Sequence, residues 1–326
     1  MYPHGNRGIK LSLTHVDGWD ERPQPGKLAT YHSSKNTLLR DGMVVKIKYG
    51  CADTDPMVDE ENLHGGSFEE VLATVFESTD ALLLVDPAGR TVEAVTTVTS
   101  AVAEPPAVRI LTDDRVLKEV MDDFVVASTA ADHVESGTLT IRTGTTAANT
   151  LLLTEESVWA LVGVDDHVAA LGSDRDGFVA AARDTYEGQW ERAEPFKLRT
   201  PPLSRVRETL GEDIGQDTRA DFDATLDALE STREATGEFD EVTLTLLVAA
   251  HNDVLLYDIS KWGEDVGIAS KATFSRTKTT LEEEGLIRTE KVPIDVGRPR
   301  LRLKLDEDQF EGATPAELAA VTLDRA

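Results

Sequence analysis

The chain has 326 residues, with 33 Lys and Arg against 60 Asp and Glu and a net charge of −27. Its length suffices for two domains, and its single cysteine, Cys51, excludes a disulfide framework and a cysteine-rich zinc site. No apolar run reaches the ~20 residues of a membrane span and no signal peptide opens the chain, so we expect a cytoplasmic protein without membrane contact.

Residues 1–56 differ in composition from the rest of the chain. They carry eight Lys and Arg against six Asp and Glu, whereas residues 57–326 carry 25 against 54. The acidic body uses 18 Arg but only seven Lys, and dense carboxylate with little Lys favours solubility in concentrated salt. These features indicate a halophile's cytosolic protein. Met57 is then the expected natural start, and residues 1–56 are translated upstream sequence or a disordered extension; the alternative is a genuine variable arm.

Apolar residues after Ser67 follow first a helical period and then short runs. Strands that alternate with helices and then follow one another predict an α/β sheet with an antiparallel portion. We assign residues 67–200 as an α/β regulatory or sensor domain. Its first helix begins at Ser67, and further helices are expected at 91–102, 116–121 and 176–196. Its strands are expected at 81–87, 107–113, 123–128, 138–143, 150–154, 157–164 and 167–173.

Polar side chains lie where the strands of this domain are expected to end. A small metabolite effector would bind at this edge, and its candidate ligands are Asp86, Thr112, Asp113 and Ser128. The small-residue segment 144–150 could cradle an anion, although a turn is the plainer interpretation. We expect no metal, no cofactor and no enzyme, because the histidines are scattered and the sequence contains no H-x-K, G-x-x-x-x-G-K-[ST], G-x-G-x-x-G or H-E-x-x-H motif.

A helical connector is predicted over residues 201–239, after the boundary marked by Pro201 and Pro202. Apolar residues at 203–214 and at 222–229 form narrow stripes on otherwise polar helices. These stripes either pack on their own domain, or they form a dimer seam or coupling helices between the sensor domain and the DNA-binding head. We favour the second interpretation and expect a homodimer, because DNA-binding proteins commonly pair to match two half-sites.

Residues 240–306 have the pattern of a winged helix-turn-helix domain, and a tail helix is expected over 307–326. An apolar core helix spans 242–250, a second helix spans 255–262, and Gly267 supplies the tight turn that follows. A third helix and two strands of alternating pattern complete the domain, which predicts an α+β fold for this part of the chain.

The third helix is the predicted recognition helix. Ser270 is its expected N-cap, Thr273 lies at its third position, and Gly285 closes it. Its outer face carries one Arg among small groups, which suits contact with guanine O6 and N7. Lys271 and Lys278 flank this face where phosphates would lie, and the wing adds further cations. The residues expected to contact DNA are Ser270, Lys271, Thr273, Ser275, Arg276, Lys278, Thr279, Thr280, Arg298 and Arg300.

Positive charge gathers in residues 271–305, called the cationic segment below. It holds nine Lys and Arg against five Asp and Glu, a balance of +4 inside an acidic chain. Double-stranded promoter DNA is therefore the expected partner. In concentrated salt the Debye length is about 3 Å, so these cations would act at contact distance, on base edges more than on phosphates in general. The alternative is an α/β ligand-binding or enzymatic protein whose winged helix mediates protein–protein contact.

Three segments are FVVASTAADHV (124–134), LRTPPLSRVRETLGEDIG (198–215) and LLYDISKWGEDVGIASKATFSRTKTTLEEEGLIRTEKVPIDVGRPRLRLKL (255–305). Together they resemble the haloarchaeal transcriptional regulators named TbsP, over roughly Phe68 to the C-terminus. The resemblance implies a transcription factor for central carbon (glucose and gluconeogenesis) genes, acting beside the sugar-responsive regulator TrmB. Residues 169–196 are also similar, more weakly, to the end of the sensor domain of TrmB-type regulators.

Overall fold

Besides the backbone of two short N-terminal strands, the computed structural model describes residues 62–144, 149–164, 167–232, 240–293, 298–306, 310 and 314–323. The chain divides into two compact units, Met1–Val58 and Asp59–Ala326. In the first unit, β1 (Thr37–Arg40) and β2 (Met43–Lys46) form an antiparallel hairpin. The prediction for residues 1–56 otherwise lies outside the described residues.

The second unit begins with a mixed sheet. Its strands are β3 (Leu63–Gly65), β4 (Ala81–Val85), β5 (Ala107–Thr112), β6 (Leu139–Thr143), β7 (Leu151–Leu153), β8 (Val158–Val164), β9 (His167–Ser173) and β10 (Glu194–Pro195). They lie in the order β10-β6-β5-β4-β7-β8-β9-β3. β5 pairs in parallel with both β4 and β6, and the other neighbours are antiparallel. This confirms the predicted α/β sheet with an antiparallel portion.

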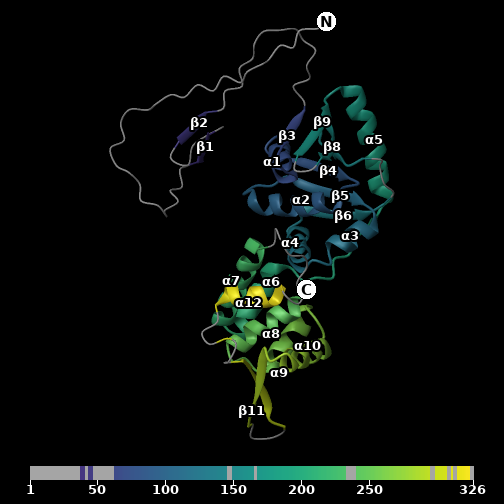
Figure 1. The fold of residues 1–326 in the computed structure, drawn as a ribbon. Coiled ribbons are helices and arrows are strands. Elements are labelled where there is room, and N and C mark those ends of the chain that lie inside the picture. The colour runs from purple at the N-terminus through teal and green to yellow at the C-terminus, as the bar shows by residue number, and fades with distance from the viewer. Residues whose placement is uncertain are drawn as a thin grey trace. The chain divides into compact units, whose positions relative to one another are not determined.

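Helices cover both faces of this sheet (Figure 1). They include α1 (Phe68–Phe76) and α2 (Gly89–Ala101) on one side and α5 (Asp176–Arg192) on the other. In β4, Leu82 and Leu84 lie in the core shared with α1 and α2, whereas Leu83 and Val85 lie in the smaller core shared with α5. A strand buried on both faces must be apolar throughout, which explains the continuous run ALLLV.

The segment predicted as a strand at 123–128 is instead the start of a helix. After α3 (Asp114–Val120), the chain forms α4 (Phe124–Glu135). Its N-cap is Asp123, whose carboxylate accepts the backbone N–H of Val126 at 3.0 Å. Val126 packs on the sheet core while Phe124 belongs to the core of the C-terminal domain. The helix therefore needs apolar residues on two sides, and its first turn has the composition of a buried strand.

The rest of the second unit is a mainly helical domain with a β-hairpin. Its elements are α6 (Leu203–Thr209), the π-helix η1 (Leu210–Ile214), α7 (Gln216–Thr232), α8 (Glu241–His251), α9 (Leu256–Val266), α10 (Lys271–Glu283), β11 (Ile287–Val292), β12 (Arg300–Leu305) and α12 (Pro315–Leu323). β11 and β12 pair antiparallel, and their hairpin extends away from the helices (Figure 1). This hairpin, residues 287–305, is called the wing below. The predicted combination of an α/β domain with a helix-turn-helix domain is confirmed.

The apolar stripes of the predicted connector are buried inside this domain. Val206, Leu210, Phe222 and Leu226 are at most 1% exposed, and they share one core with α8 and α9. A dimer seam is therefore the wrong interpretation of these stripes, because the described residues bury them in the core of their own domain. α12, expected as a tail helix, also belongs to this core: it packs against α7 and α8 and buries Leu318 completely.

Candidate nucleic-acid interface

A close approach of α9 and α10 positions the predicted recognition helix. Phe274 and Leu281, on the inner face of α10, are fully buried. A Cβ built on Gly263 of α9 would lie 2.4 Å from two atoms of the Phe274 ring, so glycine is required there. Gly267 ends α9 with a φ of +99°, a left-handed conformation that favours glycine. The predicted turn before α10 is thus confirmed.

The two ends of α10 are formed by the residues expected from the sequence. The side-chain oxygen of Ser270 accepts the backbone N–H of Thr273 at 3.2 Å, and the two hydroxyls lie 3.0 Å apart. Ser270 and Thr273 thus fix the start of the helix. At the other end Gly285 has a φ of +72°, and the backbone N–H of Leu286 donates to the carbonyl of Leu281 at 2.9 Å.

The outer face of α10 presents small side chains around one cation. The exposed residues of this face are Ala272, Ser275, Arg276, Thr279 and Thr280. The hydroxyls of Thr279 and Thr280 donate to the carbonyls one turn back, which keeps both side chains close to the helix. Arg276 is the longest side chain of this face. A groove could therefore approach the helix closely, with the Arg276 guanidinium as the group that reaches furthest.

The two lysines beside this face are both paired with carboxylates. Lys271 Nζ lies 2.6 Å from Glu264 of α9, and this hydrogen bond raises the pKa of Lys271. Lys278 Nζ lies 2.7 Å from Glu282, and its side chain is only 12% exposed. Glu282 also accepts the hydroxyl of Thr289 in the wing at 2.7 Å. These contacts join α10 to α9 and to the wing, so Lys278 is not the free phosphate contact that we expected.

Two cations of β12 are likewise held, one by α9 and one by the loop that precedes it. Arg300 Nη1 lies 3.2 Å from Asp258 of α9, and its guanidinium carbon lies 4.7 Å from the centre of the Tyr257 ring. Lys304 Nζ lies 2.9 Å from Asp253. Arg300, an expected DNA contact, therefore has a second role, because it ties the wing to the helix that supports α10.

Lys291 and Arg298 lie near the tip of the hairpin, one on each side of residues 294–297, and both are exposed. Lys291 was missing from the predicted site, and the signal that identifies it is its position at the end of a wing strand, next to the tip. Among the described residues, neither these two cations nor Arg276 has a carboxylate partner. Within the described residues, the arrangement thus places one exposed, unpaired Arg on α10 and two exposed, unpaired cations beside the tip of the hairpin.

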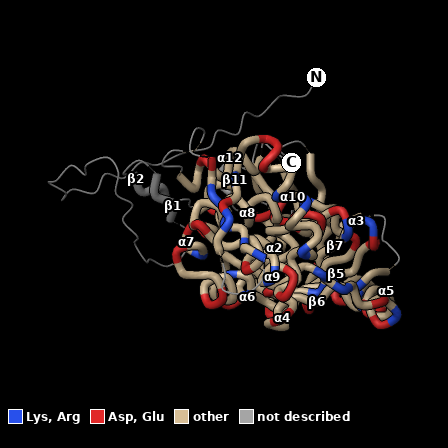
Figure 2. The backbone as a smooth tube through the Cα atoms, turned by 90° about the horizontal axis from the view of Figure 1, so that it is seen from below, with Lys and Arg blue, Asp and Glu red and all other residues tan. Residues whose placement is uncertain are grey.

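The net positive charge of the cationic segment is largely cancelled by acidic residues that fold against it. Residues 253–305 together hold ten Lys and Arg and nine Asp and Glu, a balance of +1. Asp253, Asp258 and Glu264 precede the segment but lie against its cations. Figure 2 accordingly shows Lys and Arg interspersed with Asp and Glu. A general electrostatic attraction for a polyanion is therefore weak, and the positions of the unpaired cations matter more.

Three of the four residues proposed for an effector lie together at the ends of β4 and β5. The Thr112 hydroxyl is 3.4 Å from the Asp86 carboxylate, and Asp113 caps α3. Burial raises the pKa of Asp86. The hydrogen bond from Thr112 lowers this pKa in part, and the negative charge of Asp113 raises it further. Asp86 also has a φ of +50°. Ser128 lies elsewhere: it is buried in α4 and donates to the Val125 carbonyl. Four residues of the segment 144–150 lie outside the described residues.

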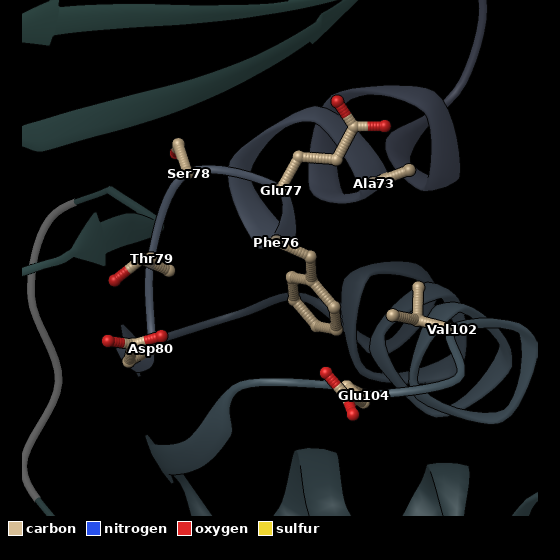
Figure 3. A pocket seen from close by; sticks show the side chains of 8 residues that line it. All are labelled: Ala73, Phe76, Glu77, Ser78, Thr79, Asp80, Val102 and Glu104. Atoms are coloured by element: carbon tan, nitrogen blue, oxygen red, sulfur yellow. The ribbon is translucent and has the colours of Figure 1, made fainter. Parts of the chain in front are cut away.

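A cavity of about 530 Å³ opens at the opposite end of these strands. The Phe76 ring lies beside Val102 and Glu104, and Glu77 and Asp80 also line the cavity (Figure 3). Its described lining has carboxylates and no Lys or Arg, which disfavours an anionic ligand. In the part of the chain that the structure describes, no group of His, Cys, Asp and Glu could hold a metal ion, and no helix is long and apolar enough to cross a bilayer.

Known proteins resemble the chain in both of its domains. Residues 60–201 match the family model described as transcriptional regulator TbsP-like, N-terminal, and residues 202–323 match its C-terminal HTH domain. No curated protein matches the chain. The solved structure of TrmBL2, described as an archaeal chromatin protein with a novel mode of DNA binding, is 16% identical, with a TM-score of 0.33.

That match covers 42% of this chain and 54% of the other, so the chain spans about half of that protein's length. The two family models, in contrast, together span residues 60–323 and leave only the N-terminal segment and three C-terminal residues unmatched. They describe transcriptional regulators and not enzymes. The chain therefore belongs to the TbsP-like transcriptional regulators, with a C-terminal helix-turn-helix domain for binding DNA.

Proposed function

We propose that the protein regulates promoters by placing the outer face of α10 in the major groove, where Arg276 contacts base edges. The observation that carries this proposal is an exposed helix face on which one unpaired Arg stands among small side chains. A guanidinium can donate two parallel N–H groups to O6 and N7 of a guanine, and such a pair is worth about 1–3 kcal/mol of base discrimination. The residues Ser275, Thr279 and Thr280 would add hydroxyl contacts to bases or phosphates.

The wing is proposed to bind the DNA backbone beside this groove. Lys291 and Arg298 have no carboxylate partner among the described residues, so their charges are available for phosphates or for the minor groove. Lys271, Lys278 and Arg300 have a mainly mechanical role in this proposal. The ion pairs of Lys271 and Arg300, and the hydrogen bond from Thr289 to the carboxylate that pairs with Lys278, hold α9, α10 and the hairpin in one arrangement, so that the two contacting elements meet the duplex together.

The wider setting of this activity is also proposed. The acidic, Lys-poor composition supports a halophile's cytosol as the place of action. The resemblance noted from the sequence supports central carbon genes as targets. A homodimer would let two copies of α10 contact two half-sites, which compensates for the single Arg on each recognition face.

We further propose that a small metabolite effector at Asp86 and Thr112 acts on the DNA-binding domain through α4. This helix enters both cores: Val126 packs on the sheet, and Phe124 lies in the core of the C-terminal domain. The Asp132 carboxylate of α4 also accepts the backbone N–H of Ser204 at 3.2 Å, at the start of α6. Because β5 runs through α3 into α4, a change at the strand ends has a continuous structural route to the helix-turn-helix.

Selection from a random duplex library in concentrated KCl tests the DNA-binding proposal. We expect the full chain to enrich one sequence that contains a guanine, and genome-wide occupancy with and without glucose to find that sequence in carbon-metabolism promoters. An Arg115→Ala variant, which removes an exposed Arg of α3, serves as control and should enrich the same sequence. Enrichment of no sequence would refute DNA recognition and favour a winged helix that contacts proteins.

A further inference from the structure

One face of the regulatory domain concentrates exposed apolar side chains. Six large hydrophobic residues are exposed in the described part of the chain, and four of them come from consecutive elements, β8, β9 and the first turn of α5. These four are Val162, Val164, Leu171 and Phe178, which are 43%, 62%, 49% and 55% exposed. Neighbouring exposed apolar side chains are uncommon on monomeric proteins and mark an interaction site; the β8 and β9 residues are such neighbours, and Phe178 follows β9 closely in the chain.

The strand register places this surface on one side of the sheet. Leu161 and Ala170 lie in the core shared with α1 and α2, so their neighbours Val162 and Leu171 point to the opposite side. Ala160 pairs with Leu171 and Val162 with Ala169, which brings the apolar side chains of both strands together. We call Ala160, Val162, Val164, Ala169, Leu171 and Phe178 the β8–β9 patch.

The helix on this side covers a different part of the sheet. The buried contacts of α5 are made by Val179 and Trp190, against a core that contains Leu83, Leu111 and Leu153 of β4, β5 and β7. Val158, at the start of β8, is the last strand residue buried there. The patch thus continues the apolar sheet face beyond the part that α5 covers, and within the described residues nothing packs on it.

Charge distinguishes the β8–β9 patch from the rest of the protein. Neither β8 nor β9 contains a Lys, Arg, Asp or Glu, although residues 57–326 carry 54 acidic residues against 25 basic ones. A second copy has the same acidic composition, so at most other surfaces docking would bring carboxylates into direct contact with carboxylates, a repulsion that acts at contact distance even in concentrated salt. At this patch two identical surfaces would meet in which His167, which pairs with Val164, is the one titratable residue of the two strands, and the like charges of the two copies would stay at the rim.

We propose that the β8–β9 patch is the interface through which two copies of this chain form a two-fold symmetric dimer. Alternating Val, Leu and Ala on two paired strands is the pattern of a sheet that packs face to face on another sheet. A two-fold axis would bring each patch onto its own counterpart. The choice of a second copy as partner rests on the proposed function, in which two recognition helices bind two half-sites, whereas the patch itself does not depend on DNA binding.

Sedimentation equilibrium of the full chain in concentrated KCl tests this interface with two independent variants. Val164→Asp and Phe178→Asp each place a charge at a position that is more than half exposed in one copy, so folding should be retained. Val134→Asp is the matched control, because Val134 is also an exposed valine, 42% exposed, but lies on α4. Far-UV circular dichroism and thermal unfolding verify that all three variants are folded.

We expect the wild type and Val134→Asp to reach twice the chain mass of 35.5 kDa, and each patch variant to dimerise about tenfold more weakly or worse. A wild type that stays monomeric, or patch variants that dimerise like the control, would overturn the proposal. Failure of the proposed DNA binding can be distinguished from failure of the proposed interface. In the first case the chain would enrich no DNA sequence, but its self-association would still depend on Val164 and Phe178.

Discussion

Gly263 is the position where the geometry of the helix-turn-helix is easiest to perturb. In Gly263→Ala, the added Cβ would lie 2.4 Å from two atoms of the Phe274 ring, whereas carbon atoms in contact are normally about 3.5–4.0 Å apart. Phe274 is fully buried, so its ring cannot move into solvent. Overpacking of a core costs about 1–3 kcal/mol, and alanine regains about 1 kcal/mol in helix propensity. Two contacts at 2.4 Å place the overpacking cost in the upper part of its range, about 2–3 kcal/mol, so we expect a net loss of about 1–2 kcal/mol of stability.

Urea unfolding of the full chain, followed by circular dichroism, measures this loss. Gly188→Ala in α5 is the matched control, because its Cβ would meet only the flexible end of Arg192, at 3.6 Å. The control should become more stable by up to about 1 kcal/mol, so the two Gly→Ala changes have opposite signs. In a Gly263→Ala/Phe274→Leu double variant, the loss should be smaller than the sum of the single losses. A Gly263→Ala variant as stable as the wild type would refute the close approach of α9 and α10.

Three further predictions concern α6, α10 and the wing. Asp132→Ala should lower stability by about 1 kcal/mol in urea unfolding, because the carboxylate accepts the backbone N–H of Ser204 at the start of α6. Burial alone would raise the pKa of Glu282, but the hydrogen bonds from Lys278 and Thr289, with the charge of Lys278, together outweigh it and hold this pKa below its usual value. The stability that Lys278→Met removes should therefore be full above pH ~4.3 and vanish as the pH falls through the lowered pKa. Lys291→Ala should reduce the magnitude of the slope of the logarithm of the DNA-binding constant against the logarithm of the salt concentration by about 0.9, because one phosphate contact is lost.

Each of these predictions has an outcome that would count against it. An Asp132→Ala variant with the unfolding free energy of the wild type would mean that the hydrogen bond between α4 and α6 does not stabilise the protein. A stability difference between wild type and Lys278→Met that persists in acid would remove Glu282 as the partner. A Lys291→Ala variant with the wild-type salt slope would place the wing away from the phosphates, and Lys261→Ala, which removes a cation paired with Asp265, is the control for charge alone.

Local patterns in the sequence were sufficient for most of the helix-turn-helix. Ser270, Gly267 and Gly285 each have a backbone role that few other residues can fill, so their positions predict the ends of α9 and α10 directly. The strand pattern of β8 and β9 was equally clear. Residues 123–128 were assigned wrongly because a short apolar run that is buried on two sides has the same composition in a strand and in a helix.

Partners distant in sequence were the part that could not be predicted. The apolar period of residues 203–229 identified a buried face correctly, but a period does not say whether the covering surface belongs to the same chain or to a second copy. Charge counted along residues 271–305 likewise omitted Asp253 and Asp258, which reach β12 only because the hairpin folds back on the helices. As a result, Lys278 and Arg300 were given the role of free cations, and Lys291 was overlooked.

The central claim is that Arg276 contacts a guanine edge, and binding to a selected duplex with modified bases tests it most directly. Each guanine is replaced in turn by 7-deazaguanine, which lacks the N7 acceptor, and affinity is measured for the wild type and for Arg276→Ala. We predict that one replacement weakens wild-type binding by roughly 5- to 150-fold, the equivalent of about 1–3 kcal/mol, and has no further effect on Arg276→Ala. Equal sensitivity of both proteins to every replacement, or full affinity of Arg276→Ala, would contradict the account.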